Sequence, residues 1–172
     1  MKLIVEIEWY QLPERRNRSP FLMTLVNRIW RTQPPQLHES DHLWDQTRVL
    51  YAMTHPEDGA PLYIGKAWGA TVYERIRARD KQRVYSRIQR QEAVPSHRLQ
   101  AMIGFVNPPG RMRMTAKLLS ECEQLLIWQL CPCGNVQSTS SYQCRDGMAV
   151  RCIGAWPLRQ QTFVDEIGYD YR

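Results

Sequence analysis

The chain lacks any run of about 18 consecutive apolar residues, the length that a membrane-spanning helix needs. Its hydrophobic start, MKLIVEIEWY, is interrupted by Glu6 and Glu8, which the apolar region of a secretory signal would not carry. These two absences predict a cytoplasmic protein that has no membrane partner.

The number of cysteines is odd, so they cannot all pair in disulfide bonds within the chain. All five cysteines lie in the last third of the 172 residues, which does not fit an evenly spaced disulfide framework. Four of them have the spacing C-x-C-x10-C-x7-C, namely Cys131, Cys133, Cys144 and Cys152. Because this spacing lacks the C-x2-C pairs of ordinary zinc sites, a zinc site remains an alternative to buried, reduced thiols.

Proline and glycine are not enriched, since the chain has 11 Pro and 9 Gly. This excludes a collagen-like or broadly disordered chain. With 172 residues, of which 43% are hydrophobic, the chain can build one sizeable core but is too short for two ordinary domains. We therefore expect one domain with extensions.

Acidic residues are scarce in one segment. Residues 75–90 hold seven Lys or Arg and a single Asp, a net charge of +6 that equals the charge of the whole chain. On a helix, five of these arginines would form one stripe. They are Arg75, Arg79, Arg83, Arg87 and Arg90. A solvated helix face and a surface for a polyanion are the two alternatives, and the scarcity of acids favours the polyanion surface.

Hydrophobic periodicity and turn residues predict the order of the elements. They are a strand over 1–9, a helix over 20–31, a hairpin of strands 49–54 and 62–66, a basic helix from about 71, a strand over 99–106, a helix over 116–130 with Thr115 as its N-cap, and a second hairpin around 145–147.

Glu123 stands out in the helix predicted over 116–130. Leu119 lies four residues before it and Leu126 three after it, so its carboxylate projects from an apolar face. Glu121, in contrast, neighbours Lys117 and is expected to be solvated. An unpaired charge on a buried face costs several kcal/mol, so Glu123 needs a partner. An ion pair with an arginine of residues 75–90 and a bound metal ion both remain open.

Five elements of the chain follow one another in a recognisable order. They are Val49-Leu50-Tyr51, Tyr63-Ile64-Gly65-Lys66-Ala67 after eleven intervening residues, an arginine in the next helix, Glu123, and the exit pattern Glu123-x3-Ile127-x4-Pro132-x2-Asn135. This order resembles the GIY-YIG endonuclease family, and the exit spacing is similar to that of its nucleotide-excision-repair members. The resemblance covers residues 49–135, about half of the chain.

The resemblance implies an α+β fold in which helices flank a three-stranded antiparallel sheet. The nuclease core would span residues 46–137, preceded by a strand–helix extension over 1–45 and followed by an extension over 138–172 that packs a hairpin on the core. These flanks are expected to add sheet edges, DNA contacts or a dimer surface. The implied activity is hydrolysis of DNA phosphodiester bonds with one divalent metal ion, Mg²⁺ or Mn²⁺.

The resemblance also implies roles for single residues. Glu123 would bind the metal, Arg75 would bind phosphate, and Asn135 would close the site from the exit loop. Tyr51, Tyr63 and Lys66 would surround the nucleophilic water. A tyrosine with its ordinary pKa of about 10 is a poor base at neutral pH, so cations must lower that pKa, and Lys66, Arg75 and the metal are the cations available. Which tyrosine acts as the base is left open.

Three departures from the family pattern are visible. The first motif is Val-Leu-Tyr, the loop from Gly65 to Arg75 is two residues longer than in the shortest members, and Arg79 stands where several members have histidine. The longer loop leaves Arg77 as an alternative for the role of Arg75.

DNA contacts are predicted for the remaining basic residues and one aromatic residue, because arginines bind phosphate and an exposed aromatic ring can stack on a base. These residues are Arg77, Arg79, Arg83, Arg87, Arg90 and Trp68. Two other functions stay open: a nucleic-acid-binding module of the same fold without cleavage, and a zinc-stabilised interaction protein.

Overall fold

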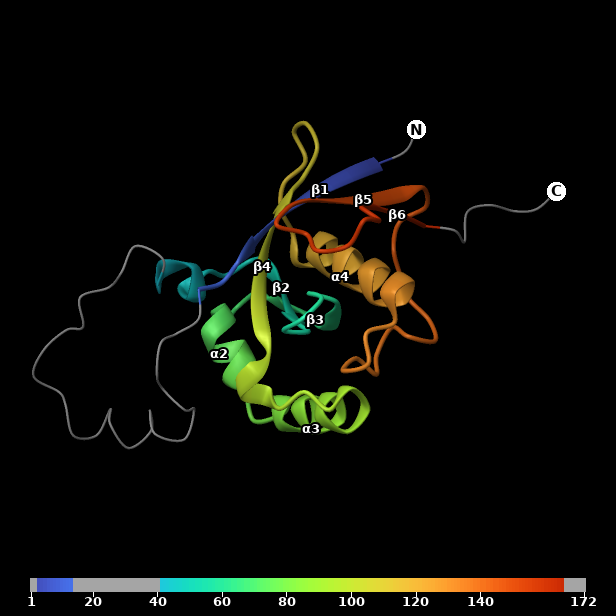
Figure 1. Ribbon diagram of the computed structural model, residues 1–172. Coiled ribbons are helices and arrows are strands. Elements are labelled where there is room, and N and C mark those ends of the chain that lie inside the picture. The colour runs from blue at the N-terminus through green and yellow to red at the C-terminus, as the bar shows by residue number, and fades with distance from the viewer. Residues whose placement is uncertain (1–2, 14–40, 166–172) are drawn as a thin grey trace, which may run out of the picture.

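The computed structural model describes residues 3–13 and 41–165, and within them six strands form one sheet in the order β3-β2-β4-β1-β5-β6 (Figure 1). Only the pair β1 and β5 is parallel, so the sheet is mixed. The strands are β1 (Leu3–Gln11), β2 (Val49–Thr54), β3 (Pro61–Ala67), β4 (Gln100–Asn107), β5 (Met148–Gly154) and β6 (Thr162–Val164).

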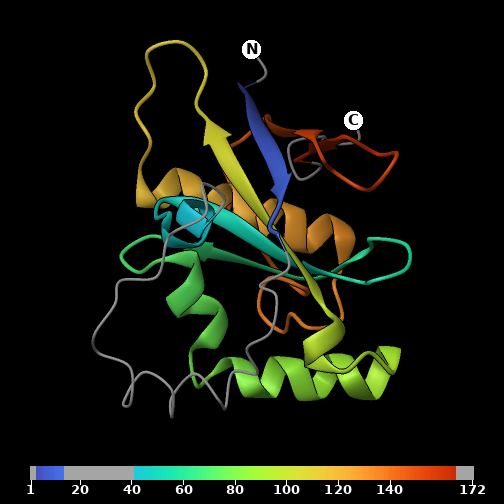
Figure 2. The same ribbon diagram turned by 60° about the vertical axis from the view of Figure 1, so that its left-hand side comes forward.

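Three α-helices in the described ranges cover the two faces of this sheet (Figures 1 and 2). They are α2 (Val72–Arg77), α3 (Lys81–Glu92) and α4 (Ala116–Leu130), and short 3-10 turns lie at Asp41–Asp45 and Ser96–Arg98. No helix in this part of the chain has the length and apolar character to cross a membrane.

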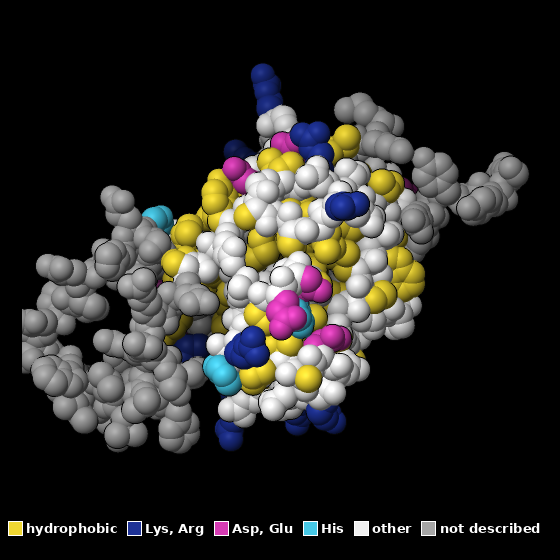
Figure 3. All heavy atoms as spheres, in the orientation of Figure 1, with side chains coloured by type: hydrophobic (Ala, Val, Ile, Leu, Met, Phe, Trp, Pro, Cys, Tyr) yellow, Lys and Arg dark blue, Asp and Glu magenta, His cyan; other side chains and the backbone are white. Residues whose placement is uncertain are grey.

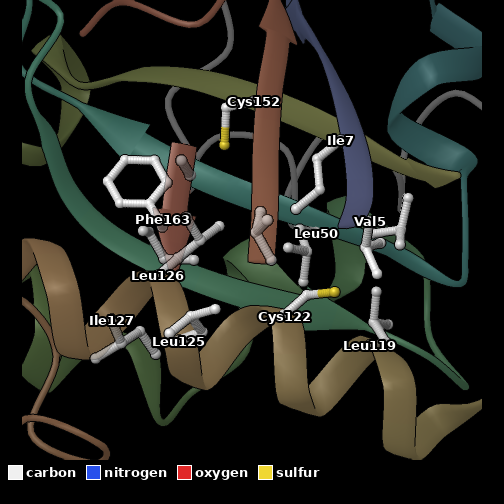
Figure 4. Close-up of a cluster of buried hydrophobic side chains, with 14 of the residues drawn as sticks. Val5, Ile7, Leu50, Leu119, Cys122, Leu125, Leu126, Ile127, Cys152 and Phe163 are labelled. Atoms are coloured by element: carbon white, nitrogen blue, oxygen red, sulfur yellow. The ribbon is translucent and has the colours of Figure 1, made fainter. Parts of the chain in front are cut away.

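The alternation of side chains along the central strands produces two buried clusters, one on each face. On β2, Leu50 and Ala52 belong to the cluster under α4, whereas Tyr51 and Met53 belong to the cluster under α2 and α3. Figure 4 shows the cluster under α4, where side chains of the helix point toward residues of β1, β2 and β5. The core is thus split by the sheet.

Most of the predicted elements are confirmed. The first strand, the hairpin of β2 and β3, and β4 lie within one or two residues of their predicted bounds. Helix α4 spans 116–130 as predicted, and the Thr115 side chain accepts a hydrogen bond from the Leu118 N–H at 3.1 Å. The helix predicted over 20–31 lies outside the described residues.

The α+β class is confirmed, but the sheet is larger than the resemblance implies. Strands β3, β2 and β4 are antiparallel neighbours. Beyond β4 the sheet continues through β1, β5 and β6, so the segments before and after the predicted core belong to the same sheet.

The second hairpin is not where the turn residues predicted it. The turn at Arg145-Asp146-Gly147 leads into β5, which pairs in parallel with β1 from Leu3 opposite Met148. No strand precedes this turn within 131–147. The hairpin instead joins β5 to β6 through residues 155–161.

The prediction of a single basic helix is also wrong, because α2 ends at Arg77 and α3 starts at Lys81. At Ala78 the backbone turns to an extended conformation with ψ of 142°. The Tyr85 hydroxyl of α3 donates a 2.5 Å hydrogen bond to the Ile76 carbonyl and thereby satisfies the C-terminal end of α2. The continuous arginine stripe therefore does not exist, although basic side chains still gather at the lower edge of the molecule, where α3 lies (Figure 3).

Candidate active site

Strand β3 lies at one edge of the sheet and carries predicted site residues on both of its faces. Tyr63 belongs to the buried cluster under α2 and α3, whereas the neighbouring Ile64 belongs to the cluster under α4. Lys66 follows Ile64 by two residues and reaches Glu123 of α4 on that same face. The predicted site is therefore divided between the two sides of one strand.

Tyr51 and Tyr63 pack together on the face of α2 and α3. Their ring centroids are 5.9 Å apart, and Tyr51 stands directly opposite Gly65 in the ladder of β2 and β3. A Cβ atom at Gly65 would lie 2.7 Å from the Tyr51 hydroxyl and 2.9 Å from Cε1 of Tyr63. Glycine is required in this motif because two buried rings occupy the space above its Cα.

The electrostatic environment of Tyr51 differs from the expectation that nearby cations lower its pKa. Burial raises the pKa of Tyr51 far above its ordinary value, the neighbouring Tyr63 raises it further, and Arg75 opposes these effects without overcoming them. No group in the described part of the chain makes a well-aligned hydrogen bond to the buried Tyr51 hydroxyl. Burial therefore shifts the pKa of Tyr51 in the direction opposite to the lowering that a general base needs.

Arg75 is the arginine that the structure brings to the tyrosines. Its Nη2 lies 3.9 Å from Oδ2 of Asp80, and its charge acts on Tyr51. Burial raises the pKa of Asp80, but Lys81 and Arg75 outweigh this and leave that pKa below its ordinary value. Arg77 instead donates to the Tyr73 hydroxyl and stacks on that ring, so it is not the arginine of the tyrosine cluster.

Lys81 is a site residue that the sequence analysis did not single out. Its Nζ donates a 2.6 Å hydrogen bond to the Tyr63 hydroxyl and lies 4.8 Å from the centre of the Tyr63 ring. Only 7% of Lys81 is exposed. The available signal was that Lys81 is the one lysine among the arginines of residues 75–90.

Glu123 has the partner that its position requires, and this partner is a lysine of β3 instead of an arginine of residues 75–90. Its Oε2 accepts a 2.7 Å hydrogen bond from Nζ of Lys66, and 14% of its side chain is exposed. Oε1 has no hydrogen bond or ion pair within 3–13 and 41–165. Because Lys66 neutralises the carboxylate, burial alone no longer argues for a metal.

Glu121 is buried, and the expectation that it is solvated is wrong. Only 4% of it is exposed, and its Oε2 lies 2.6 Å from Nη2 and 2.8 Å from Nε of Arg145. The segment before β5 folds over α4 and brings Arg145 to this carboxylate. The spacing within α4 could not show this, because the partner comes from 24 residues further along the chain.

Asn135 lies beside β3 and binds its backbone. Its Oδ1 accepts a 2.9 Å hydrogen bond from the Ile64 N–H, and its Nδ2 donates to the Ile64 carbonyl at 2.8 Å. The Gly134 N–H adds a 2.7 Å bond to the Leu62 carbonyl. The exit loop therefore satisfies the open edge of β3 between Tyr63 and Gly65, which supports the position of both.

Replacing Asn135 with alanine is expected to lower the free energy of unfolding by about 1–3 kcal/mol, because two buried backbone groups of Ile64 lose their partners. Thermal and urea unfolding measure the loss. Asn107→Ala serves as the matched control, since Asn107 is exposed at the end of β4. An Asn135→Ala variant as stable as the control would show that this hydrogen-bonded pair does not hold the edge strand.

The residues predicted to contact DNA differ in how accessible they are. Arg79, in the turn between α2 and α3, is exposed, as are Arg83 and Arg90 on α3. Arg87 instead donates a 3.2 Å hydrogen bond to the Gly134 carbonyl, beside an open groove of about 740 Å³ that runs between α3 and the exit loop. The guanidinium of Arg48 lies 5.4 Å from the centre of the half-buried Trp68 ring.

The four spaced cysteines lie in different surroundings. Cys131 is exposed and its thiol contacts the Trp128 carbonyl, whereas Cys152 is buried in the core, which raises the pKa of its thiol to about 12. In the described ranges, no group of three or more His, Cys, Asp or Glu side chains is placed to hold a metal ion. The zinc alternative gains no support from this geometry.

The arrangement around β3 combines a half-buried carboxylate, cations on both sides of the strand, and a phenol oxygen held by an ammonium group. Such groups are suited to binding and orienting a phosphate ester. Comparison of the chain with protein-family models, with curated proteins and with solved structures found no match.

Proposed function

We propose that the chain is a metal-dependent endonuclease that hydrolyses DNA phosphodiester bonds, with its active site along the edge strand β3. One observation carries the proposal: of the six residues that the family resemblance selects, three lie on β2 and β3, two form hydrogen bonds with residues of β3, and one acts through its charge on Tyr51 of β2. The six residues are Tyr51, Tyr63, Lys66, Arg75, Glu123 and Asn135. They come from elements spread over 85 positions of the chain, so their convergence is not a consequence of sequence proximity.

The donor set on the face of α4 is compatible with Mg²⁺ or Mn²⁺. Mg²⁺ commonly uses one or two carboxylates and keeps several waters, so the carboxylate of Glu123, whose Oε1 is not engaged by the described residues, can supply the protein ligand. A bound metal would supply charge for the phosphoryl oxygens and a more acidic water.

Four other residues of the proposed site would have separate roles in binding and orienting the substrate. Lys66 holds the Glu123 carboxylate in one orientation, and the partly exposed Arg75 offers a permanently charged, planar group to a phosphate. Tyr63 lies on the face of α2 and α3, opposite to Glu123, and its hydroxyl group can orient a water there by hydrogen bonding. Asn135 keeps the backbone between these side chains in place.

A DNA-binding module without cleavage is the second candidate, and the Lys66–Glu123 ion pair favours it. A lysine 2.7 Å from the carboxylate competes with a divalent cation for the same oxygen. In this case the basic residues would still bind DNA, but no divalent cation would be required.

The two candidates are separated by incubating the purified protein with supercoiled, linear and branched DNA, with Mg²⁺ or Mn²⁺ and with a chelator. The endonuclease proposal predicts strand breaks on at least one of these DNAs that disappear with the chelator. Binding to all three DNAs without breaks in either metal would support the module and reject the endonuclease.

Replacing Arg79, Arg83 and Arg90 together with glutamine is expected to weaken DNA binding on every sequence. Contacts to phosphate carry no base information, and each one contributes about 0.9 to the slope of log K against log salt, so the slope should fall by up to about 3. Binding titrations at several salt concentrations measure this. Arg159→Gln, an exposed arginine between β5 and β6, is the control, and an unchanged slope in the triple variant would contradict the assignment.

A further inference from the structure

Lys81 is buried in a position that ordinary folding energetics does not favour. Taking an ammonium group out of water costs several kcal/mol unless a strong partner replaces the water. Its acidic neighbour, Asp80, lies 3.3 Å away, but 61% of the Asp80 side chain is exposed, so solvent screens this ion pair. The closest partner of the Lys81 ammonium is instead the Tyr63 hydroxyl, at 2.6 Å.

The chemistry of this contact fixes the orientation of the hydroxyl. An ammonium group has three donors and no acceptor, so the Tyr63 oxygen must accept the hydrogen bond, and the phenol proton points elsewhere. Nζ also lies 4.8 Å from the centre of the Tyr63 ring, which adds a cation–π contact. Lys81 thus holds both the oxygen and the ring of Tyr63.

The other groups around the Tyr63 oxygen do not provide this charge. Tyr51 is buried and Tyr85 is half-buried, burial raises the pKa of both phenols, and Arg75 lies near Asp80. Lys66, to which the family resemblance assigns a place beside the tyrosines, is on the opposite face of β3 and is bound to Glu123.

We propose that Lys81 is the positioning residue of the Tyr63 hydroxyl in phosphodiester hydrolysis. It turns the phenol proton away from the ammonium group, so that this proton can be donated in a hydrogen bond to the reacting water, and the positive charge of Lys81 stabilises the partial negative charge that this donation leaves on the Tyr63 oxygen. This inference rests on the proposed endonuclease activity and adds to it a residue outside the family pattern. A lysine that serves only the fold would have no such effect on turnover.

The test compares cleavage and thermal unfolding for the parent, Lys81→Met, Lys81→Arg, Tyr63→Phe and the double variant Lys81→Met/Tyr63→Phe. Lys81→Met should lower kcat about 100-fold and change KM little, since general acid–base contributions are of this size. Lys81→Met removes a costly buried ammonium group but also leaves the Tyr63 hydroxyl without its partner, so the unfolding temperature of this variant should stay close to that of the parent. Lys81→Arg keeps the charge and should recover part of kcat.

The double variant shows whether the two residues act as a unit. It should be no slower than the slower single variant, whereas independent roles would multiply the two losses. Lys117→Met, at an exposed lysine of α4, is the matched control and should cut like the parent.

Parent-like cleavage by Lys81→Met or by Tyr63→Phe would overturn the inference, as would multiplied losses in the double variant. If Lys81→Met fails to fold, the Tyr63→Phe and Lys81→Arg variants still test the proposal. A Tyr63→Phe variant with the kcat of the parent would contradict it. A folded Lys81→Arg variant whose kcat is no higher than that of Tyr63→Phe would also contradict it. If the parent protein cuts no DNA, the proposed endonuclease activity itself is rejected. If the parent cuts DNA and Lys81→Met cuts it equally well, only the role of Lys81 is rejected.

Discussion

Glu123→Gln is expected to reduce DNA cleavage by at least about 100-fold. The substitution keeps the size of the side chain but removes the charge, and a hard cation such as Mg²⁺ requires anionic oxygen. DNA binding should persist or become tighter, because a negative charge near the phosphate is lost. Cleavage of supercoiled DNA and binding to the same DNA measure the two effects.

Stability separates this catalytic role from a purely structural ion pair. The glutamine still accepts a hydrogen bond from Lys66, and 37% of the Lys66 side chain is exposed, so the free energy of unfolding should fall by only about 1 kcal/mol. A loss of about 3–5 kcal/mol would identify Glu123 as a structural residue. Cleavage at the parent rate would reject the metal role.

Gly65→Ala is expected to disrupt the tyrosine cluster. The added Cβ would lie 2.7 Å from the Tyr51 hydroxyl, and the hydrogen bonds from Asn135 to Ile64 restrict any shift of β3. Overpacking of this kind costs about 1–3 kcal/mol, and the displaced tyrosines should lose most of the cleavage activity. Unfolding curves and cleavage assays at a temperature where the variant is folded measure both losses.

Gly104→Ala is the matched control for this variant. A Cβ at Gly104 would lie 2.8 Å from Cγ2 of Ile7 and 3.0 Å from the Trp9 ring, so it also overpacks the core, but in the cluster under α4. Both variants should lose stability, and Gly65→Ala should lose far more activity. Equal residual activities would show that Gly65 matters only for packing.

Elements with strong local signals could be predicted from the sequence. Helix α4 combines a capping threonine with an apolar face and a proline after its end, and its predicted bounds are confirmed. The break between α2 and α3 could not be predicted, because no glycine or proline interrupts 72–92. It depends on contacts between the two helices and the sheet, such as the bond from Tyr85 to the Ile76 carbonyl and the bond from Lys81 to Tyr63.

The division of the site was partly visible in the sequence. Tyr63 and Lys66 are three residues apart in a strand, so the period of two already places them on opposite faces. The identity of the partners was not visible, because Glu123 pairs with a residue 57 positions away and Glu121 with one 24 positions away. Helical spacing identified Glu123 as a residue that needs a partner, but the same reasoning failed for Glu121.

The most direct test of the account follows the relaxation of supercoiled plasmid DNA over time by the parent and by Glu123→Gln, each with Mg²⁺ and with a chelator. The account predicts nicking by the parent in Mg²⁺ and none with the chelator, with nicking by Glu123→Gln at least about 100-fold slower although it still binds the plasmid. Equal nicking by both proteins, or nicking by the parent that persists in the chelator, would contradict it.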